Sequence, residues 1–475
     1  MSLAPCLIIP AAGAALIAAC GRRPNVREAI SLASAAATFA LAVLFTPEVL
    51  RGERPRAVLG EMLPGLELVL ELEPLGLLFA LIASGLWFVS AVYSIGYMRG
   101  NREENQTRFY ACFALAIGSA LGVALAGNLL TLYLFYDALT LITWPLVTHH
   151  DDDDARRGGR TYLALLLGSS ILFLLPALAI TWWQAGTLDF RPGGILAGRV
   201  SGWEASGLLA LYVFGIGKAA LMPIHRWLPA AMVAPTPVSA LLHAVAVVKA
   251  GVFSIVKVVI YVFGLEFARE SFAWLPWVAG LTIVAASVVA LRSDNLKRRL
   301  AYSTVSQLSY VVLAAAILTP LSVAGAALHI AAHAVGKITL FFAAGAIYTA
   351  AHKTEVSELD GIGRRMPWTL AAFGVGALSM IGLPPAAGFV SKWFIVSGAL
   401  EAGQWLALGV ITVSTLLNAG YFLPILYRAF FKASQGAGHG EAPATMVAAL
   451  VATAALTVLM FFFADLPLAL ARSLR

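Results

Sequence analysis

Long apolar stretches repeat along the whole chain, and they constrain its fold more than any other feature. A segment of about 20 predominantly apolar residues can span a bilayer as a helix, and we count about fourteen such segments. Of the 475 residues, 60% are hydrophobic and 12% are charged, whereas soluble domains have roughly 45–50% and 25%. The sequence therefore predicts an all-α, polytopic membrane protein in which residues 1–475 form a single membrane domain.

The predicted spans leave short loops and no room for a separate soluble domain. Their bounds are 2–20, 29–46, 73–97, 109–126, 129–148, 161–182, 207–224, 238–263, 273–291, 300–319, 321–350, 368–398, 405–428 and 444–466. Spans 321–350 and 368–398 are longer than a bilayer requires, so we expect them to tilt, break or extend beyond it.

Basic residues are distributed unequally over the loops. Loops that follow odd-numbered spans hold nineteen Lys and Arg residues, and the opposite side holds eight, including Arg269 and Arg475. Because cytoplasmic loops are enriched in Lys and Arg, the odd loops are predicted to be cytoplasmic and both termini to lie outside the cytoplasm. This bias accounts for the net charge of +7 without nucleic-acid binding. The predicted location is the cell inner (cytoplasmic) membrane.

Two local patterns suggest other chemistry, but each has a simpler explanation. The run His149–Asp154 contains two histidines and four aspartates. Adjacent residues on a loop do not converge on one metal ion without a supporting shell, so a solvated turn is favoured. Cys6, Cys20 and Cys112 have neither metal-ligand spacing nor a disulfide framework. Residues 17–20 resemble a lipoprotein cleavage site, but no basic residue precedes them, so an uncleaved first helix is expected.

Five basic residues lie inside apolar spans or at their edges, and all five are lysines: Lys218, Lys249, Lys257, Lys337 and Lys392. Lysine can release its proton when it is desolvated, whereas arginine stays charged. A lysine inside a helix bundle can therefore carry a proton in one step and release it in the next. Lys257 is the weakest candidate, because a lysine near a span end can extend to the interface.

Acidic and imidazole groups extend this row of lysines. Asp137 is the acidic residue that lies deep in a long apolar span. A charge at the bilayer centre costs about 2.5–3.5 kcal/mol. Six such groups would together exceed a typical domain's stability of about 5–15 kcal/mol unless they pair or face water. His329, His333 and Lys337 follow the spacing i, i+4, i+8 of one helical face, which favours a relay. His243 lies in the eighth span.

Prolines interrupt two spans beside buried lysines. Four prolines between residues 223 and 237 follow Lys218, and the sequence GLPP at 382–385 precedes Lys392. Proline removes a backbone hydrogen bond, and non-helical backbone at membrane depth is tolerated only against protein or a water-filled cavity. Paired interrupted helices indicate a transporter built from inverted repeats.

Four segments resemble one known family. They are LPAAMVAPTPVSALLHAVAVVKAG (228–251), DNLKRRLAYSTVSQ (294–307), HAVGK (333–337) and GLPPAAGFVSK (382–392). These segments resemble the signature blocks of the antiporter-like subunits of respiratory complex I and of Mrp-type multisubunit cation/proton antiporters, including the D-type component of the latter. The resembling blocks fall in order within about residues 109 to 400.

The resemblance implies a fold and a set of site residues. It implies a fourteen-helix core with broken helices and two inverted five-helix repeats, near 109–263 and 273–428. Its proton-pathway residues are matched by Asp137 in the fifth helix, Lys218 in the seventh, His243 and Lys249 in the eighth, His333 and Lys337 in the eleventh, and Lys392 in the twelfth. The family usually has glutamate at the position of Asp137. Aspartate is one methylene shorter, and a bridging water or a local shift would compensate.

These observations predict proton translocation through buried Asp, Lys and His residues, by one of the membrane subunits of a multisubunit cation/proton antiporter. Asp137 and Lys218 are expected to form a conformation-dependent ion pair whose separation releases a proton towards Lys249, the histidines and Lys392. Two alternatives stay open: a proton-pumping subunit of a complex I-like NADH:quinone oxidoreductase or membrane-bound hydrogenase, and a non-transporting scaffold.

The expected partners and cofactors follow from the same reasoning. The partners are homologous membrane subunits and membrane lipid, and the transported ions are protons, with sodium as a second candidate. The chain is not expected to be catalytic alone, although a redox-driven complex could contain it. The sequence has no Gly-rich dinucleotide motif, Cys cluster or haem motif, so no cofactor is expected. A nearby quinone pocket stays open.

Overall fold

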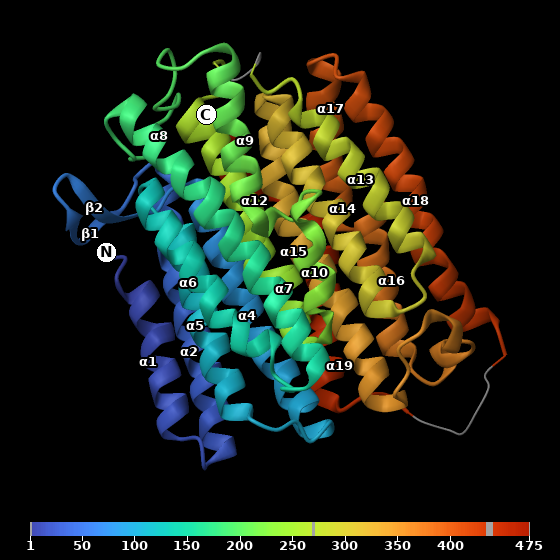
Figure 1. The fold of residues 1–475 in the computed structure, drawn as a ribbon. Coiled ribbons are helices and arrows are strands. Elements are labelled where there is room, and N and C mark those ends of the chain that lie inside the picture. The colour runs from blue at the N-terminus through green and yellow to red at the C-terminus, as the bar shows by residue number, and fades with distance from the viewer. Residues whose placement is uncertain (1, 268–270, 434–439, 475) are drawn as a thin grey trace.

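The computed structural model describes residues 2–267, 271–433 and 440–474 as a bundle of long, roughly parallel helices (Figure 1). In this part of the chain, eleven helices are long and apolar enough to cross a membrane. Two shorter apolar helices, Pro5–Ala19 and Pro367–Ile381, accompany them. The predicted all-α membrane fold is confirmed, with a span count near the expected fourteen. Arg269 and Arg475 lie outside the described residues.

The first half of the bundle contains one element that is not helical, a β-hairpin after the second span. The elements are α1 (Pro5–Ala19), α2 (Pro24–Leu44), α3 (Thr46–Leu50), β1 (Arg56–Leu63), β2 (Leu66–Glu71), α4 (Pro74–Gly100), α5 (Gln106–Ala124), α6 (Leu129–Val147), α7 (Asp153–Ser169), the π-helical turn η1 (Ser170–Leu174), α8 (Leu175–Ala185) and α9 (Gly202–Gly215). Strands β1 and β2 pair antiparallel. Prolines begin α1, α2 and α4, where their missing N–H costs nothing.

The second half contains the breaks. Its short elements are the 3₁₀ turns η2 (Gly217–Ala219), η3 (Ile224–Arg226), η4 (Ala231–Val233), η7 (Val356–Glu358) and η8 (Ile362–Arg364), and the π-helical turns η5 (Leu241–Val245) and η6 (Val258–Phe263). Its helices are α10 (Trp227–Ala230), α11 (Thr236–Ala240), α12 (Val247–Lys257), α13 (Leu275–Arg292), α14 (Leu296–Ile317), α15 (Pro320–Ala351), α16 (Pro367–Ile381), α17 (Ala387–Glu401), α18 (Trp405–Phe431), α19 (Ala444–Phe462) and α20 (Asp465–Arg472).

The helices are broken beside two of the buried lysines. Helix α9 ends at Gly215, and Lys218 lies on the short turn η2 that follows. Span 368–398 separates into α16 and α17, and Lys392 lies on the second of them. By contrast, span 321–350 forms the single 32-residue helix α15. Both breaks leave backbone groups unpaired inside the bundle, where side chains can use them.

Loops that follow odd-numbered spans meet on one face, which we call the basic face. The bonds that join them are Arg27 Nη2 to Gln106 Oε1 (2.8 Å), His150 Nε2 with Glu103 Oε2 (3.2 Å), Lys297 Nζ to Ala234 O (2.6 Å), Leu296 N to Thr354 O (2.8 Å) and Gly361 N to Arg428 O (2.9 Å). The grouping of the basic loops inferred from the sequence therefore corresponds to one surface of the bundle.

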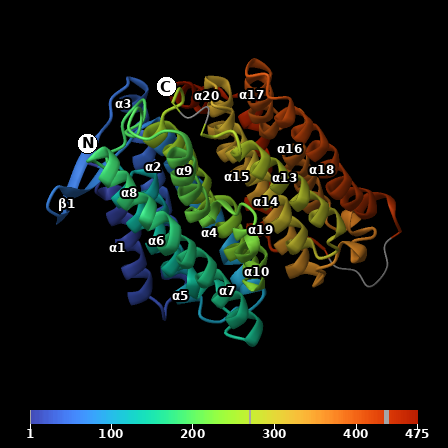
Figure 2. The same ribbon diagram turned by 45° about the horizontal axis from the view of Figure 1, so that its top comes forward.

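The β-hairpin and the even-numbered loops meet on the other end of the bundle, the opposite face. The bonds that join them are Glu71 N to Leu125 O (2.7 Å), Leu129 N to Leu188 O (3.0 Å) and Leu196 N to Val262 O (2.9 Å). The first turn of α1 and the C-terminal helix α20 lie on this face as well (Figure 2). Both ends of the described chain are therefore on the same side.

Candidate functional site

The candidate residues are concentrated in the two most deeply buried spans. In the stretch from Thr236 to Phe263 and in α15, the most apolar windows are entirely buried inside the protein. The stretch Thr236–Phe263 carries His243, Lys249 and Lys257. Helix α15 carries His329, His333 and Lys337. A charged side chain this deep in a bundle is shielded from lipid and has to find polar partners within the protein.

Lys249 and His333 form the centre of the site. The Lys249 ammonium hydrogen-bonds directly to His333 Nδ1, from α12 to α15. Neither side chain is more than 1% exposed. The other ring nitrogen of His333, Nε2, is buried and has no hydrogen-bond partner. One side of this imidazole is thus joined to a lysine while the other is free to exchange a proton.

His329 continues the row one helical turn away. Its ring centroid lies 6.1 Å from that of His333. Nδ1 of His329 is 2.9 Å from Ser391 Oγ, and Nε2 is 3.0 Å from Gln307 Oε1. Both ring nitrogens therefore have partners on other helices, α17 and α14, which fixes the orientation of the ring.

The row reaches Lys392 through a backbone carbonyl exposed by the second helix break. Gln307 Nε2 donates to Met380 O at 3.1 Å. Lys392 Nζ donates to the same oxygen at 3.0 Å and to Ile381 O at 2.9 Å. These carbonyls end α16, where they lack helical partners and carry partial negative charge that favours an ammonium. Gly382 makes this possible, because a Cβ there would lie 2.5 Å from Lys392 Cδ.

Lys218 is held at the first helix break, but it does not pair with Asp137 in this structure. Its Nζ donates to Tyr136 O at 2.8 Å and to Thr140 Oγ1, and stands 3.3 Å from the Tyr136 ring centroid. Asp137 is half-buried and accepts from Ser170 Oγ at 3.0 Å, while its other carboxylate oxygen has no partner. The expected pairing therefore stays a prediction about another conformation.

Lys337 and His243 lie beside the row rather than in it. Lys337 Nζ donates to Ser303 Oγ at 2.7 Å, and Tyr421 donates to the same oxygen at 2.9 Å. His243 lies in the π-helical turn η5 with both ring nitrogens unpartnered, and its ring centroid is 4.6 Å from that of Phe341. The stripe His329, His333, Lys337 thus contacts three different sets of partners, although its members share one helical face.

Lys257 does not extend to the interface as a lone lysine would. It is 1% exposed, and its Nζ lies 3.5 Å from Glu73 Oε1. Glu73 is 2% exposed and begins α4, accepting from Leu75 N and Gly76 N. Reasoning from residue patterns did not single out Glu73, because it stands at the first residue of an apolar span.

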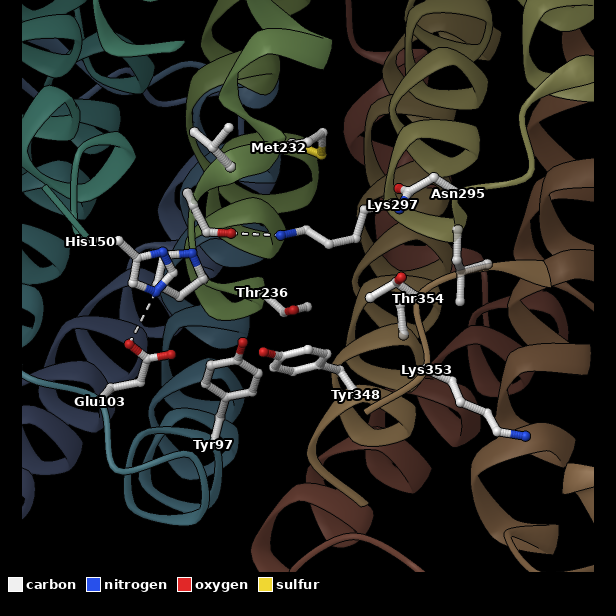
Figure 3. A pocket seen from close by; sticks show the side chains of 15 residues that line it. Tyr97, Glu103, His150, Met232, Thr236, Asn295, Lys297, Tyr348, Lys353 and Thr354 are labelled. Atoms are coloured by element: carbon white, nitrogen blue, oxygen red, sulfur yellow. Dashed lines mark hydrogen bonds and ion pairs between the residues drawn. The ribbon is translucent and has the colours of Figure 1, made fainter. Parts of the chain in front are cut away.

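A cavity of about 270 Å³ with both polar and apolar lining residues opens on the basic face (Figure 3). Its lining residues come from loops far apart in the chain and include Glu103, His150, Thr236, Lys297 and Tyr348. On α15, Ala344 and Tyr348 follow Lys337 by seven and eleven residues, which places them on the face of Lys337. On the other wall, Thr236 precedes His243 by seven residues, about 10 Å of helix.

The loop of residues 149–154 is more structured than a solvated turn. His150 pairs with Glu103, whose carboxylate raises the pKa of His150. His149 is 3% exposed, and burial lowers its pKa to about 4. Asp152 caps α7 by accepting from Ala155 N at 2.7 Å. In the described part of the chain, no cluster of three or more His, Cys, Asp or Glu side chains forms a metal site.

The partners of the candidate residues were largely missed from the sequence. Gln307 and Ser303 come from the resembling block 294–307, so their positions were visible but their roles were not. Ser170 lies in the π-helical turn η1, and Tyr136 precedes Asp137. Serine and tyrosine recur in the apolar spans of this sequence, and only the packing shows which side chain faces a lysine.

A close backbone approach at Gly251 positions the first break against α12. A Cβ at Gly251 would lie 2.3 Å from both Lys218 C and Ala219 N. We expect Gly251→Ala to destabilise the protein by about 1–3 kcal/mol, because backbone atoms cannot yield as a side-chain tip can. Gly168→Ala is the matched control, since a Cβ there meets nothing within 4 Å. Thermal melting of both purified variants measures this, and equal melting temperatures would contradict the prediction.

The fold and the buried residues define the class of this protein: a multi-pass membrane bundle with a row of titratable side chains between two broken helices. The profile of the family "NADH:quinone oxidoreductase/Mrp antiporter, TM" matches residues 126–418. The "NADH-quinone oxidoreductase subunit N" of Desulforudis audaxviator is 34% identical over 86% of this chain and 82% of its own length. The chain therefore belongs to this family of antiporter-like membrane subunits, as the resembling blocks indicated.

Two further comparisons match proteins that are named as parts of multisubunit complexes. A probable K(+)/H(+) antiporter component of Rhizobium meliloti, of the A/B type, is 32% identical over 75% of this chain, which corresponds to 36% of that relative. A chain in the "Structure of Mrp complex from Dietzia sp. DQ12-45-1b" superposes with a TM-score of 0.89. That match covers 100% of this chain and 97% of the other, at 21% sequence identity, and so bears on the fold alone.

Proposed function

We propose that this protein translocates protons across the membrane, as one of the membrane subunits of a multisubunit cation/proton antiporter. The observation that carries the proposal is the row of buried titratable side chains Lys249, His333, His329 and Lys392. Lys249 bonds His333, the rings of His333 and His329 are 6.1 Å apart, and Gln307 with Met380 O links His329 to Lys392. Lysine and histidine can both take up and release a proton, and keeping them at membrane depth costs free energy, which supports proton transfer over a structural role.

The cavity on the basic face is proposed as the aqueous entrance of the route. Its walls lie on the same helix faces as Lys337 and His243. These two residues are about two helical turns deeper in the bundle than the walls. The two unpartnered nitrogens of His243 support this role, because a buried imidazole without partners is costly unless water reaches it. A proton from the cavity would pass by His243 to Lys249 and then along the row.

Lys218 and Asp137 are proposed to control transfer into this row. Their side chains have separate partners here, so this structure supports the unpaired state. When they pair, the carboxylate favours the charged ammonium, and when they separate, Lys218 yields its proton more easily. The close contact of Gly251 with the backbone at Lys218 provides a path by which movement at the break reaches α12.

The proposed internal symmetry agrees with the placement of the breaks. In the proposed repeats, 109–263 and 273–428, the broken helix is the fourth span of each. Each break carries one buried lysine, Lys218 in the first repeat and Lys392 in the second. Both ends of the described chain lie on the same side of the bundle, which supports an even number of spans. The basic face carries more Lys and Arg residues, which supports its placement in the cytoplasm.

The comparisons favour homologous membrane subunits as partners, because the relatives and the matched structure are named as parts of larger complexes. A second candidate is a proton-pumping subunit of an NADH:quinone oxidoreductase-like complex, favoured by the 34% identity to the NADH-quinone oxidoreductase relative. A non-transporting scaffold is disfavoured, since a scaffold would gain stability by replacing its buried lysines with apolar residues.

The test is proton flux through the complex purified by a tag on this chain and reconstituted in liposomes with an internal pH dye. A sodium pulse, and separately an imposed potassium diffusion potential, supply the driving force. We expect flux in the wild type and a fall of about tenfold or more in His329→Gln, because an amide can hold the neighbouring hydrogen bonds but cannot carry a proton.

The matched control is His352→Asn at the exposed end of the same helix, where asparagine tolerates the left-handed backbone. Equal flux in His329→Gln and His352→Asn would reject the proposed route. An assembled wild type that carries no protons under either driving force would reject the function itself.

A further inference from the structure

The proton route outlined above does not use the buried pair of Glu73 and Lys257, which lies towards the opposite face. Lys257 is eight residues beyond Lys249 on α12, about 12 Å along the helix axis. The side chains of Lys257 and Glu73 are 1% and 3% exposed. Burying an ion pair seldom stabilises a protein more than well-packed apolar residues would. The pair therefore needs an explanation beyond stability.

The two members of the pair are held unequally. Four donors converge on the Glu73 carboxylate: Leu75 N at 2.7 Å, Gly76 N at 2.9 Å, Tyr261 Oη at 3.2 Å and Lys257 Nζ. These contacts fix the position of the Glu73 carboxylate beside Lys257.

Lys257 has fewer polar partners than Glu73. Its Nζ donates to Ala126 O at 2.6 Å and lies 3.5 Å from Glu73. The remaining neighbours are aromatic, with ring centroids of Phe190 and Phe253 at 4.6 Å and 5.4 Å. After losing one proton, Lys257 would still carry two N–H groups, so Ala126 O could keep its donor. The Glu73 carboxylate would keep its bonds from Leu75 N, Gly76 N and Tyr261 Oη.

A gradient of exposure leads from this lysine to the surface. Glu71, at the end of β2, pairs with Arg54 at 3.6 Å, and their side chains are 17% and 32% exposed. Arg54 also lies over the ring of Tyr261, 5.8 Å from its centroid, and Tyr261 donates to Glu73. Charged and polar groups therefore extend from the opposite face, beside the β-hairpin, to the buried Lys257.

We propose that Lys257 is a further proton carrier of this protein, through which the row exchanges protons with water on the opposite face, and that Glu73 is its positioning residue. This rests on the proposed proton translocation. In each transfer one N–H bond of the ammonium breaks, its electron pair stays on the amine, and one proton with its charge passes to water. The reverse step restores the ammonium.

The decisive variant is Lys257→Arg in the tagged, reconstituted complex. Arginine keeps the positive charge and the ion pair with Glu73 but does not release its proton. We expect assembly to persist and proton flux to fall about tenfold or more. Lys432→Arg is the matched control, because Lys432 also pairs with a carboxylate, Asp360 at 3.6 Å, on the basic face. Flux equal to the wild type in Lys257→Arg would show that only the charge is needed, and would overturn the proposal.

A second variant keeps the proposal testable if the larger guanidinium lowers the melting temperature. Glu73→Gln preserves shape and one accepting oxygen but removes the counterion, and the other charged groups nearby, Glu71 and Arg54, stay in place. The ammonium then holds its proton less tightly, so the alkaline limb of the flux–pH profile should move to lower pH. If Glu73→Gln has the same flux–pH profile as the wild type, the role of Lys257 is overturned. The proposed function is unaffected by that result as long as the wild type itself carries protons.

Discussion

Replacing Lys218 with alanine is expected to abolish proton flux in the reconstituted complex while the complex still assembles. The lysine is a fully buried titratable group at the first helix break, and the phenol and hydroxyl groups beside it do not exchange protons near neutral pH as an amine can. Its partners, Tyr136 O and Thr140 Oγ1, belong to one helix and remain hydrogen-bonded or solvated without it. A loss of about 100-fold or more is expected, the upper range for removing a proton-transfer group.

Two companion variants separate chemistry from packing at this position. Lys218→Met fills the space of the side chain without a charge, and Lys218→Arg keeps the charge but not the exchangeable proton. Both are expected to be as inactive as Lys218→Ala, whereas Lys432→Ala on the basic face should transport normally. Flux in Lys218→Arg close to the wild-type rate would show that Lys218 acts only as a fixed charge.

Lys249→Met is expected to reduce flux to a similar extent, by about 100-fold, because it removes the direct partner of His333. The ammonium of Lys249 is the contact that joins α12 to the imidazoles of α15. Without Lys249, no titratable side chain of α12 is hydrogen-bonded to His333. A proton released at Lys218 then cannot pass through α12 to His333. The measurement is initial dye response after a sodium pulse or an imposed potential, normalised to the amount of assembled complex.

Ser254→Ala is the control for this substitution on the same helix. Ser254 is buried on α12, but its hydroxyl donates to Ala250 O within its own helix. Its removal changes packing slightly and leaves every inter-helix contact of the row intact. Comparable losses in Ser254→Ala and Lys249→Met would mean that flux depends on the integrity of α12 and not on the lysine.

Several parts of the site could be predicted from the sequence, because charged residues and prolines inside apolar spans cost free energy and are therefore uncommon. A lysine inside an apolar span is rare enough to be recognised one residue at a time, which is why Lys218, Lys249, Lys337 and Lys392 stood out. The proline breaks were visible for the same reason, since proline cannot donate in a helix. Both features recur in the structure at the expected positions, and Lys218 and Lys392 lie at the breaks.

Other parts depended on how the helices pack. Periodicity placed His329, His333 and Lys337 on one face, but it could not show that each meets a different helix. Glu73 was not singled out because its burial results from the β-hairpin folding against residues 125–128. A search for long apolar spans does not detect a hairpin. The π-helical turn that carries His243 likewise has no sequence signal of its own.

The sequence by itself determined that this chain spans the membrane many times and keeps titratable groups inside, because hydrophobicity and charge are properties of single residues and short segments. Only the tertiary structure decided which of those groups touch. Lys249 meets His333 across 84 positions of sequence, Lys218 and Asp137 stand apart, and Glu73 meets Lys257. These pairings are set by the contact of helices distant in the chain, and hydrogen bonds form only over a few ångströms.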